Sequence, residues 1–135
     1  MSINRRMALR VAMASATAAI FGSSTSAQAS GTRIVRLSKV KVGGSHKFQL
    51  ANGAPALLFR TKAGVFAYQT ICTHQGGDVN YLAAGKLMVC GVHNASFNPF
   101  AGGKVVKGPT GSSASSISPL PSVKVKVVGA WIVLS

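Results

Sequence analysis

Cysteine and histidine are concentrated in two short stretches, Cys72-Thr73-His74 and Cys90-Gly91-Val92-His93, which are separated by 15 residues. The two stretches contain both cysteines of the chain and two of its three histidines. Thiolates and imidazoles are the side chains with which proteins bind zinc and iron. If these four side chains bind one metal centre, the fold must bring two separate loops together.

Three kinds of centre are compatible with two thiols and two imidazoles. In an exported chain, Cys72 and Cys90 alone would suggest a disulfide, but a disulfide leaves the histidine after each cysteine unexplained. Two cysteines and two histidines also make a tetrahedral zinc site, although zinc fingers usually pair cysteine with cysteine and histidine with histidine along the chain. A [2Fe–2S] centre, with two thiolates on one iron and two imidazoles on the other, accounts for the mixed order.

The residues around these donors resemble a known family. The stretches from Cys72 to Gly77 and from Cys90 to Asn98 look like the two cluster-binding loops of the Rieske family, and the resemblance extends from about Arg33 to the C-terminus. It implies one Rieske [2Fe–2S] cluster per chain, bound by Cys72, His74, Cys90 and His93. It also implies that the two loops form a small subdomain with both histidines near the surface.

Two departures from the family pattern carry further expectations. Many Rieske proteins have one more cysteine in each loop, and these two form a disulfide; the corresponding positions here are Gly77 and Val92. The resemblance therefore implies loops held by packing and backbone hydrogen bonds alone, as in Rieske-type ferredoxins. Where high-potential members have a serine and a tyrosine, this chain has Ala95 and Phe97, which cannot donate to cluster sulfur. We expect a potential in the lower part of the range of about −150 to +300 mV.

The first 29 residues have the features of an export signal. Arg5 and Arg6 precede a weakly apolar run from Val11 to Gly22, and Ala27-Gln28-Ala29 is a cleavage site of the Ala-x-Ala type. The paired arginines resemble a twin-arginine signal, which predicts a periplasmic protein with a mature domain from residue 30 to residue 135. The alternative is that the segment is retained as a membrane anchor.

The remainder of the chain has the pattern of β-structure. Short alternating or β-branched runs predict strands over residues 33–37, 39–42, 48–50, 56–60, 65–68, 123–127 and 131–134. Asn52-Gly53 and Lys62-Ala63-Gly64 are typical of hairpin turns. These runs predict an all-β domain of antiparallel strands. The resemblance implies a Rieske-like β-sandwich with a small cluster-binding subdomain. Trp131 is expected in the core, and residues 111–118 are expected to form a flexible Gly/Ser-rich loop.

The charge of the chain limits the kinds of partner that it is expected to bind. The chain has 15 Lys and Arg against a single acid, Asp78, for a formal charge of +14. Such a surface favours an acidic redox partner, for example a cytochrome or the large subunit of an oxidoreductase. A nucleic-acid partner is not expected, because no basic helical stripe or aromatic-interleaved stacking platform is visible. Asp78 follows the first loop and is expected either to influence His74 or to make an Asx-turn contact.

No second metal set, catalytic triad, carboxylate pair or nucleotide-binding loop is visible in the sequence. The sequence therefore predicts an exported one-electron carrier. Two alternatives remain: the small Rieske subunit of a larger periplasmic oxidoreductase, similar to that of arsenite oxidase, and a structural zinc module.

Overall fold

The computed structural model describes residues 31–135, so the predicted signal of residues 1–29 lies outside the described part. This part folds into antiparallel strands with three short 3₁₀ turns, and none of its helices is long and apolar enough to cross a membrane. The predicted all-β class is confirmed. The strands are β1 (Arg33–Arg36), β2 (Ser45–Gln49), β3 (Pro55–Thr61), β4 (Gly64–Gln69), β5 (Val79–Leu82), β6 (Leu87–Cys90), β7 (Ser96–Asn98), β8 (Lys104–Lys107), β9 (Ser122–Val123), β10 (Val125–Val128) and β11 (Trp131–Leu134).

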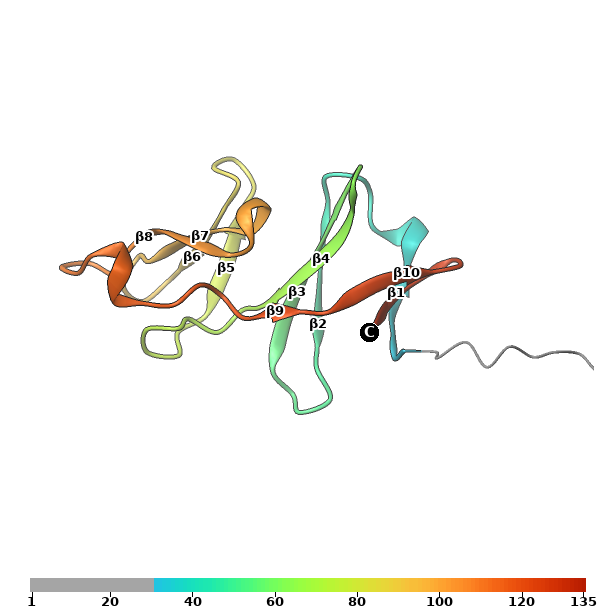
Figure 1. The fold of residues 1–135 in the computed structure, drawn as a ribbon, viewed down its shortest axis with the longest axis horizontal. Coiled ribbons are helices and arrows are strands. Elements are labelled where there is room, and N and C mark those ends of the chain that lie inside the picture. Colours follow the sequence, from blue (N-terminus) through green and yellow to red (C-terminus); the bar gives the residue numbers. More distant parts are fainter. Residues whose placement is uncertain (1–30) are drawn as a thin grey trace, which may run out of the picture.

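The strands form three sheets in two bodies (Figure 1). The sheets β1-β11-β10 and β2-β3-β4-β9 make up the larger body, which we call the base (residues 31–69 and 121–135). The sheet β5-β6-β7-β8 belongs to the subdomain (residues 70–120). In Figure 1 the subdomain lies at one end of the molecule and β1 and β10 lie at the other.

The predicted hairpins of the base are present. β2 pairs with β3 and β3 pairs with β4, both antiparallel. In the first turn Gly53 has a φ of 82°, which glycine adopts without strain, and the Asn52 side chain accepts a hydrogen bond from the Ala54 N–H. Turn residues that are visible in the sequence thus determine that β2, β3 and β4 are neighbours in one sheet.

The predicted strand over residues 39–42 was wrong. The chain instead makes a 3₁₀ turn at Leu37–Lys39 and then a bend. The Arg60 guanidinium donates to the carbonyls of Leu37 (2.9 Å) and Val40 (2.8 Å), and the Val40 side chain is buried. Because these carbonyls are occupied by a side chain from β3, the segment forms a corner between the two sheets of the base instead of a strand.

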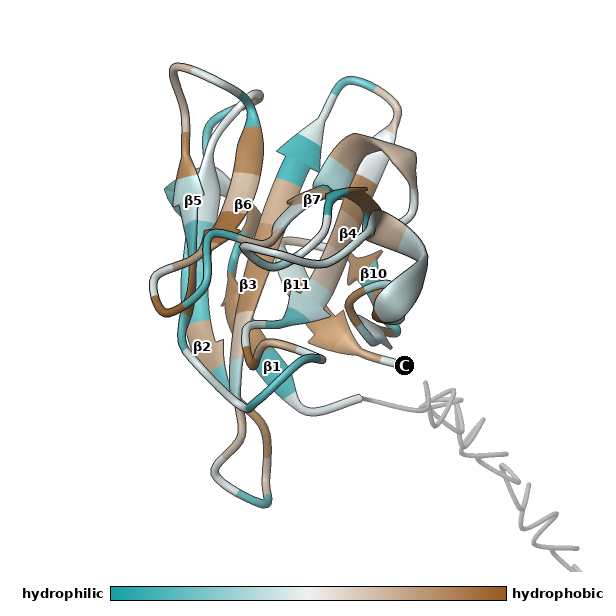
Figure 2. Ribbon diagram, turned by 90° about the vertical axis from the view of Figure 1, so that its left-hand side faces the viewer, coloured by the Kyte–Doolittle hydropathy of each residue, from teal (hydrophilic) through white to brown (hydrophobic). Residues whose placement is uncertain are grey.

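Two apolar clusters form the core of the protein. One cluster, around Leu58 and Ile132, lies between the sheets of the base. The other joins base and subdomain, and it includes Phe59, Met88 and both cysteines. Figure 2 shows apolar colouring along β3 and β6, the strands that contribute Phe59 and Met88. Folding of the core therefore positions the cysteines directly.

Tyr68 adds a polar connection between the bodies. Its buried hydroxyl, in β4, donates to the Pro99 carbonyl of the subdomain at 2.7 Å. Burial raises the pKa of this tyrosine, so the phenol stays protonated and remains a donor.

Replacing Tyr68 by phenylalanine should lower the free energy of unfolding by about 1–3 kcal/mol, because the Pro99 carbonyl loses its buried donor. Urea unfolding of the cluster-loaded protein measures this change. Tyr81→Phe, at a half-buried tyrosine of the same aromatic group, is the control and should change stability by less than about 0.5 kcal/mol. Equal effects of the two changes would contradict the assigned role of the Tyr68 hydroxyl.

Candidate metal centre

The two predicted loops have the same backbone hydrogen bonds. In the first loop the Cys72 N–H donates to the Gly77 carbonyl (2.7 Å), and the Cys72 carbonyl accepts from Gly76 (3.0 Å). In the second loop the Cys90 N–H donates to Ala95 (2.8 Å), and the Cys90 carbonyl accepts from Asn94 (3.1 Å). Each cysteine is therefore bonded to the residues four and five positions after it.

The fourth residue after each cysteine makes this turn feasible. Gly76 has a φ of 73° and Asn94 a φ of 58°. The left-handed region is open to glycine and is tolerated by asparagine better than by most other residues. The recurrence of Gly and Asn four residues after each cysteine is visible in the sequence, but it indicates this turn only once the two loops are compared.

The loops are fixed beside one another by strand pairing. Val79 pairs with Cys90 across β5 and β6, and the Gly91 N–H donates to the Asp78 carbonyl at 3.1 Å. An isolated bridge between Ile71 and Asp78 closes the base of the first loop. All four predicted ligands are thereby brought to one end of the subdomain.

The two cysteines are free, buried and in contact with each other. Burial raises the pKa of the Cys72 thiol, although N–H groups of His74 and Gln75 act against this rise. Burial also opposes ionisation of Cys90, but N–H groups of Val92 and His93 and the Cys72 thiol hold the Cys90 pKa below its ordinary value. Each sulfur thus faces backbone donors from the second and third residues after it, which suits a thiolate.

The two histidines form the second pair. The rings of His74 and His93 are half-buried and meet edge to face, with centroids 4.9 Å apart and planes at 77°. Nδ1 of His74 is buried and has no hydrogen-bond partner within residues 31–135. A buried polar atom without a partner is costly. Coordination of a metal would satisfy it.

The donors are sorted by kind, thiol with thiol and imidazole with imidazole. Within residues 31–135, no three His, Cys, Asp or Glu side chains gather closely enough to hold a single metal ion. A Rieske [2Fe–2S] cluster uses two thiolates on one iron and two imidazoles on the other. The residues present fit such a cluster.

A third segment holds both loops in place. The Thr73 hydroxyl donates to the Ser118 carbonyl at 2.6 Å. The N–H and hydroxyl of Thr110 donate to the His93 carbonyl at 2.7 and 3.0 Å. The expectation of a flexible linker over residues 111–118 missed this role, since the bonds use backbone carbonyls that leave no mark in the sequence.

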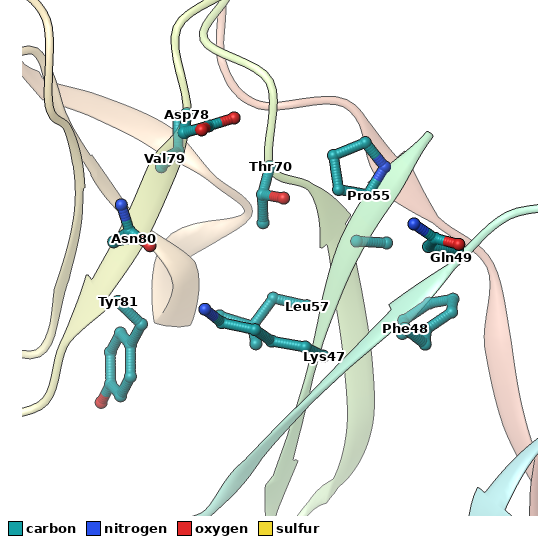
Figure 3. Close-up of a pocket in the computed structure, with 11 residues that line it drawn as sticks. Lys47, Phe48, Gln49, Pro55, Leu57, Thr70, Asp78, Val79, Asn80 and Tyr81 are labelled. Atoms are coloured by element: carbon teal, nitrogen blue, oxygen red, sulfur yellow. The ribbon is translucent and has the colours of Figure 1, made fainter. Parts of the chain in front are cut away.

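Ala95 and Phe97, the positions expected to lack donors, are fully buried behind the second loop. The charge of Asp78 acts to raise the pKa of Cys90, which is a local influence on the site of the kind expected, although on a cysteine. Its carboxylate is exposed, and its backbone carbonyl makes the contact with the second loop. The side chain lies on a cleft of about 430 Å³ between β2, β3 and β5, together with Lys47, Thr70 and Asn80 (Figure 3). None of the four predicted ligands lines this cleft.

Gly77 and Val92, the positions of the disulfide in many Rieske proteins, lie against each other. A Cβ added to Gly77 would be 3.3 Å from Cβ of Val92 and 2.6 Å from its Cγ2. Disulfide-bonded residues have Cβ atoms about 3.5–4.5 Å apart. The geometry needed for a bridge is therefore nearly present without the cysteines.

Introducing Gly77→Cys together with Val92→Cys should create a disulfide that raises the free energy of unfolding by about 3 kcal/mol, because it closes a loop of about 15 residues. Thiol counting and urea unfolding test this, with Gly77→Ala plus Val92→Ala as the control. Persistence of both new thiols under oxidising conditions would contradict the observed loop contact.

Comparison with known proteins agrees with this geometry. Residues 31–134 match the Rieske [2Fe-2S] domain. Among curated protein sequences none matches the chain. Among solved structures, the cyanobacterial plasma membrane Rieske protein PetC3 from Synechocystis PCC 6803 is similar, with 28% identity and a TM-score of 0.62; the match covers 77% of this chain and 98% of that protein.

Two ferredoxins share the fold at lower identity. The ferredoxin of carbazole 1,9a-dioxygenase from Nocardioides aromaticivorans IC177 is 19% identical, with a TM-score of 0.57 and coverage of 78% of this chain and 97% of that one. The Sphingomonas yanoikuyae B1 ferredoxin is also 19% identical, with a TM-score of 0.56 and the same coverage. Taken with the domain match over most of its length, these likenesses show that the chain belongs to the Rieske [2Fe–2S] family.

Proposed function

We propose that this protein is an exported one-electron carrier whose [2Fe–2S] cluster is bound by Cys72, His74, Cys90 and His93. The observation that carries the proposal is the pair of loops with matching hydrogen bonds, which bring two buried thiols into contact with each other and two imidazoles into contact with each other. Membership of the Rieske family supports an iron–sulfur role in electron transfer. The bound cluster supplies the chemistry, which is the uptake and release of one electron at a time.

The chain's own residues determine how a redox partner reaches the cluster. His74 and His93 are each only half-buried, so part of each residue is accessible to solvent. Val92, next to His93, is 60% exposed and gives the partner an apolar contact. We infer that the partner docks on this end of the subdomain. An acidic surface on the partner would match Lys107, which pairs with Ser96 in the second loop.

Export is inferred from the N-terminal sequence. A twin-arginine signal and an Ala-x-Ala site precede the domain. Export of a folded protein suits a cofactor inserted before translocation. A periplasmic location follows for the mature protein, with membrane attachment only if the segment is retained.

The ligand assignment is tested by metal analysis of the full chain expressed with iron–sulfur assembly proteins. We expect two irons and two labile sulfides per chain, and a Rieske-type electron paramagnetic resonance signal after reduction. Cys72→Ala, Cys90→Ala and His74→Ala should each abolish that signal. His46→Ala, which removes the third histidine, should leave it unchanged. Bound zinc without iron, or loss of the signal in His46→Ala, would contradict the assignment.

The potential provides a second test. Ala95→Ser adds a hydroxyl to the second loop and should raise the reduction potential by about 40 mV, since one hydrogen bond of about 1 kcal/mol that favours the reduced cluster corresponds to this shift for a single electron. Protein-film voltammetry measures the shift. Ser96→Ala is the matched control, because Ser96 lies one position away from the family's serine, and it should shift the potential by less than about 20 mV. A larger shift in the control would contradict the alignment of the loop.

A further inference from the structure

Positive charge is distributed unevenly between the two bodies. Residues 31–135 contain twelve Lys and Arg, and nine of them belong to the base. The subdomain has three cations and Asp78, so its formal charge is +2 while that of the base is +9. Most of the field of this protein is therefore centred away from the predicted cluster ligands.

Part of that charge surrounds the single tryptophan of the chain. The guanidinium carbons of Arg33 and Arg36 lie 4.8 and 4.7 Å from the ring centroid of Trp131. Trp131 was expected in the core, but it is only half-buried. At least 94 residues lie between the arginines and the tryptophan, which explains why the sequence did not reveal this basic and aromatic group.

Strand register extends the group across a whole sheet face. Arg36 pairs with Trp131 across β1 and β11, and Lys126 of β10 pairs with Val133. Since alternate residues of a strand share a face, Lys126 points to the same side as Val133 and Trp131. The outer face of the sheet β1-β11-β10, which we call the Trp131 face, thus presents Arg33, Arg36 and Lys126, all exposed, around a half-buried indole.

We propose that the Trp131 face docks on the surface of an anionic lipid bilayer. Basic side chains near such a surface gain from its negative potential, and tryptophan is favoured at the membrane–water interface because its ring is apolar and its N–H is polar. The described chain starts at Gly31 next to this face: the Leu134 N–H bonds to the Thr32 carbonyl.

Docking in this way would leave the subdomain directed away from the lipid. β1 and β10 lie at the opposite end of the molecule from β5–β8 (Figure 1). The accessible parts of His74 and His93 would then remain open to a redox partner. Attachment to the lipid would thus use the base, and electron transfer would use the subdomain at the other end of the molecule.

Flotation with vesicles tests the proposal on the full-length, cluster-loaded chain. Arg33→Gln, Arg36→Gln and Lys126→Gln together should weaken binding to phosphatidylglycerol vesicles about a hundredfold at low salt, given about fivefold for each basic residue. Lys86→Gln, Lys104→Gln and Lys107→Gln together remove the same charge from the subdomain and should weaken it less than about fivefold. The N-terminal segment is the same in both, so its contribution cancels.

Fluorescence of the only tryptophan reports the orientation directly. Brominated anionic lipids should quench Trp131 emission in the bound protein, and phosphatidylcholine vesicles should not bind it. Equal loss of binding in the two triple variants would overturn the proposal, as would binding without quenching. Failure to bind vesicles together with tight binding of single-stranded DNA would also overturn it and would identify a polyanion site instead.

Discussion

The site depends on one constraint, the closure of each loop by the backbone of its own cysteine. The Cys72 and Cys90 backbones each bond to the residues four and five positions later, and the next N–H groups turn toward the sulfur. The cysteines are also part of the core that joins base and subdomain. Because loop closure and core packing share these two residues, the donor geometry is set by the same interactions that stabilise the fold.

Much of the fold and site was predictable, for identifiable reasons. The hairpins around Asn52-Gly53 and residues 62–64 have strong turn chemistry, and the four donors stand out as a mixed motif. Strands β5 to β8 were not predicted: they are three or four residues long, and neither Leu87–Cys90 nor Lys104–Lys107 alternates apolar with polar residues. The contacts of Thr73 and Thr110 were also missed, since their partners are backbone carbonyls.

The distribution of charge changes the interpretation of the +14 chain. From composition alone, the positive charge would guide an acidic partner to the cluster. The structure assigns most of it to the base, with Arg33 and Arg36 against Trp131 at the far end. The subdomain that contains the histidines has a formal charge of only +2, which is suited to a partner that must bind and leave. Composition cannot distinguish these uses, because it does not show where the strands place each cation.

The central claim is that His74 and His93 bind the same iron while Cys72 and Cys90 bind the other. Hyperfine spectroscopy of the reduced protein, labelled with ¹⁵N-histidine and carrying His46→Ala, tests this most directly. The account predicts strong couplings from two histidine nitrogens to the reduced iron. A coupling from one nitrogen only, or from none, would show that the two loops do not pair their donors in this way.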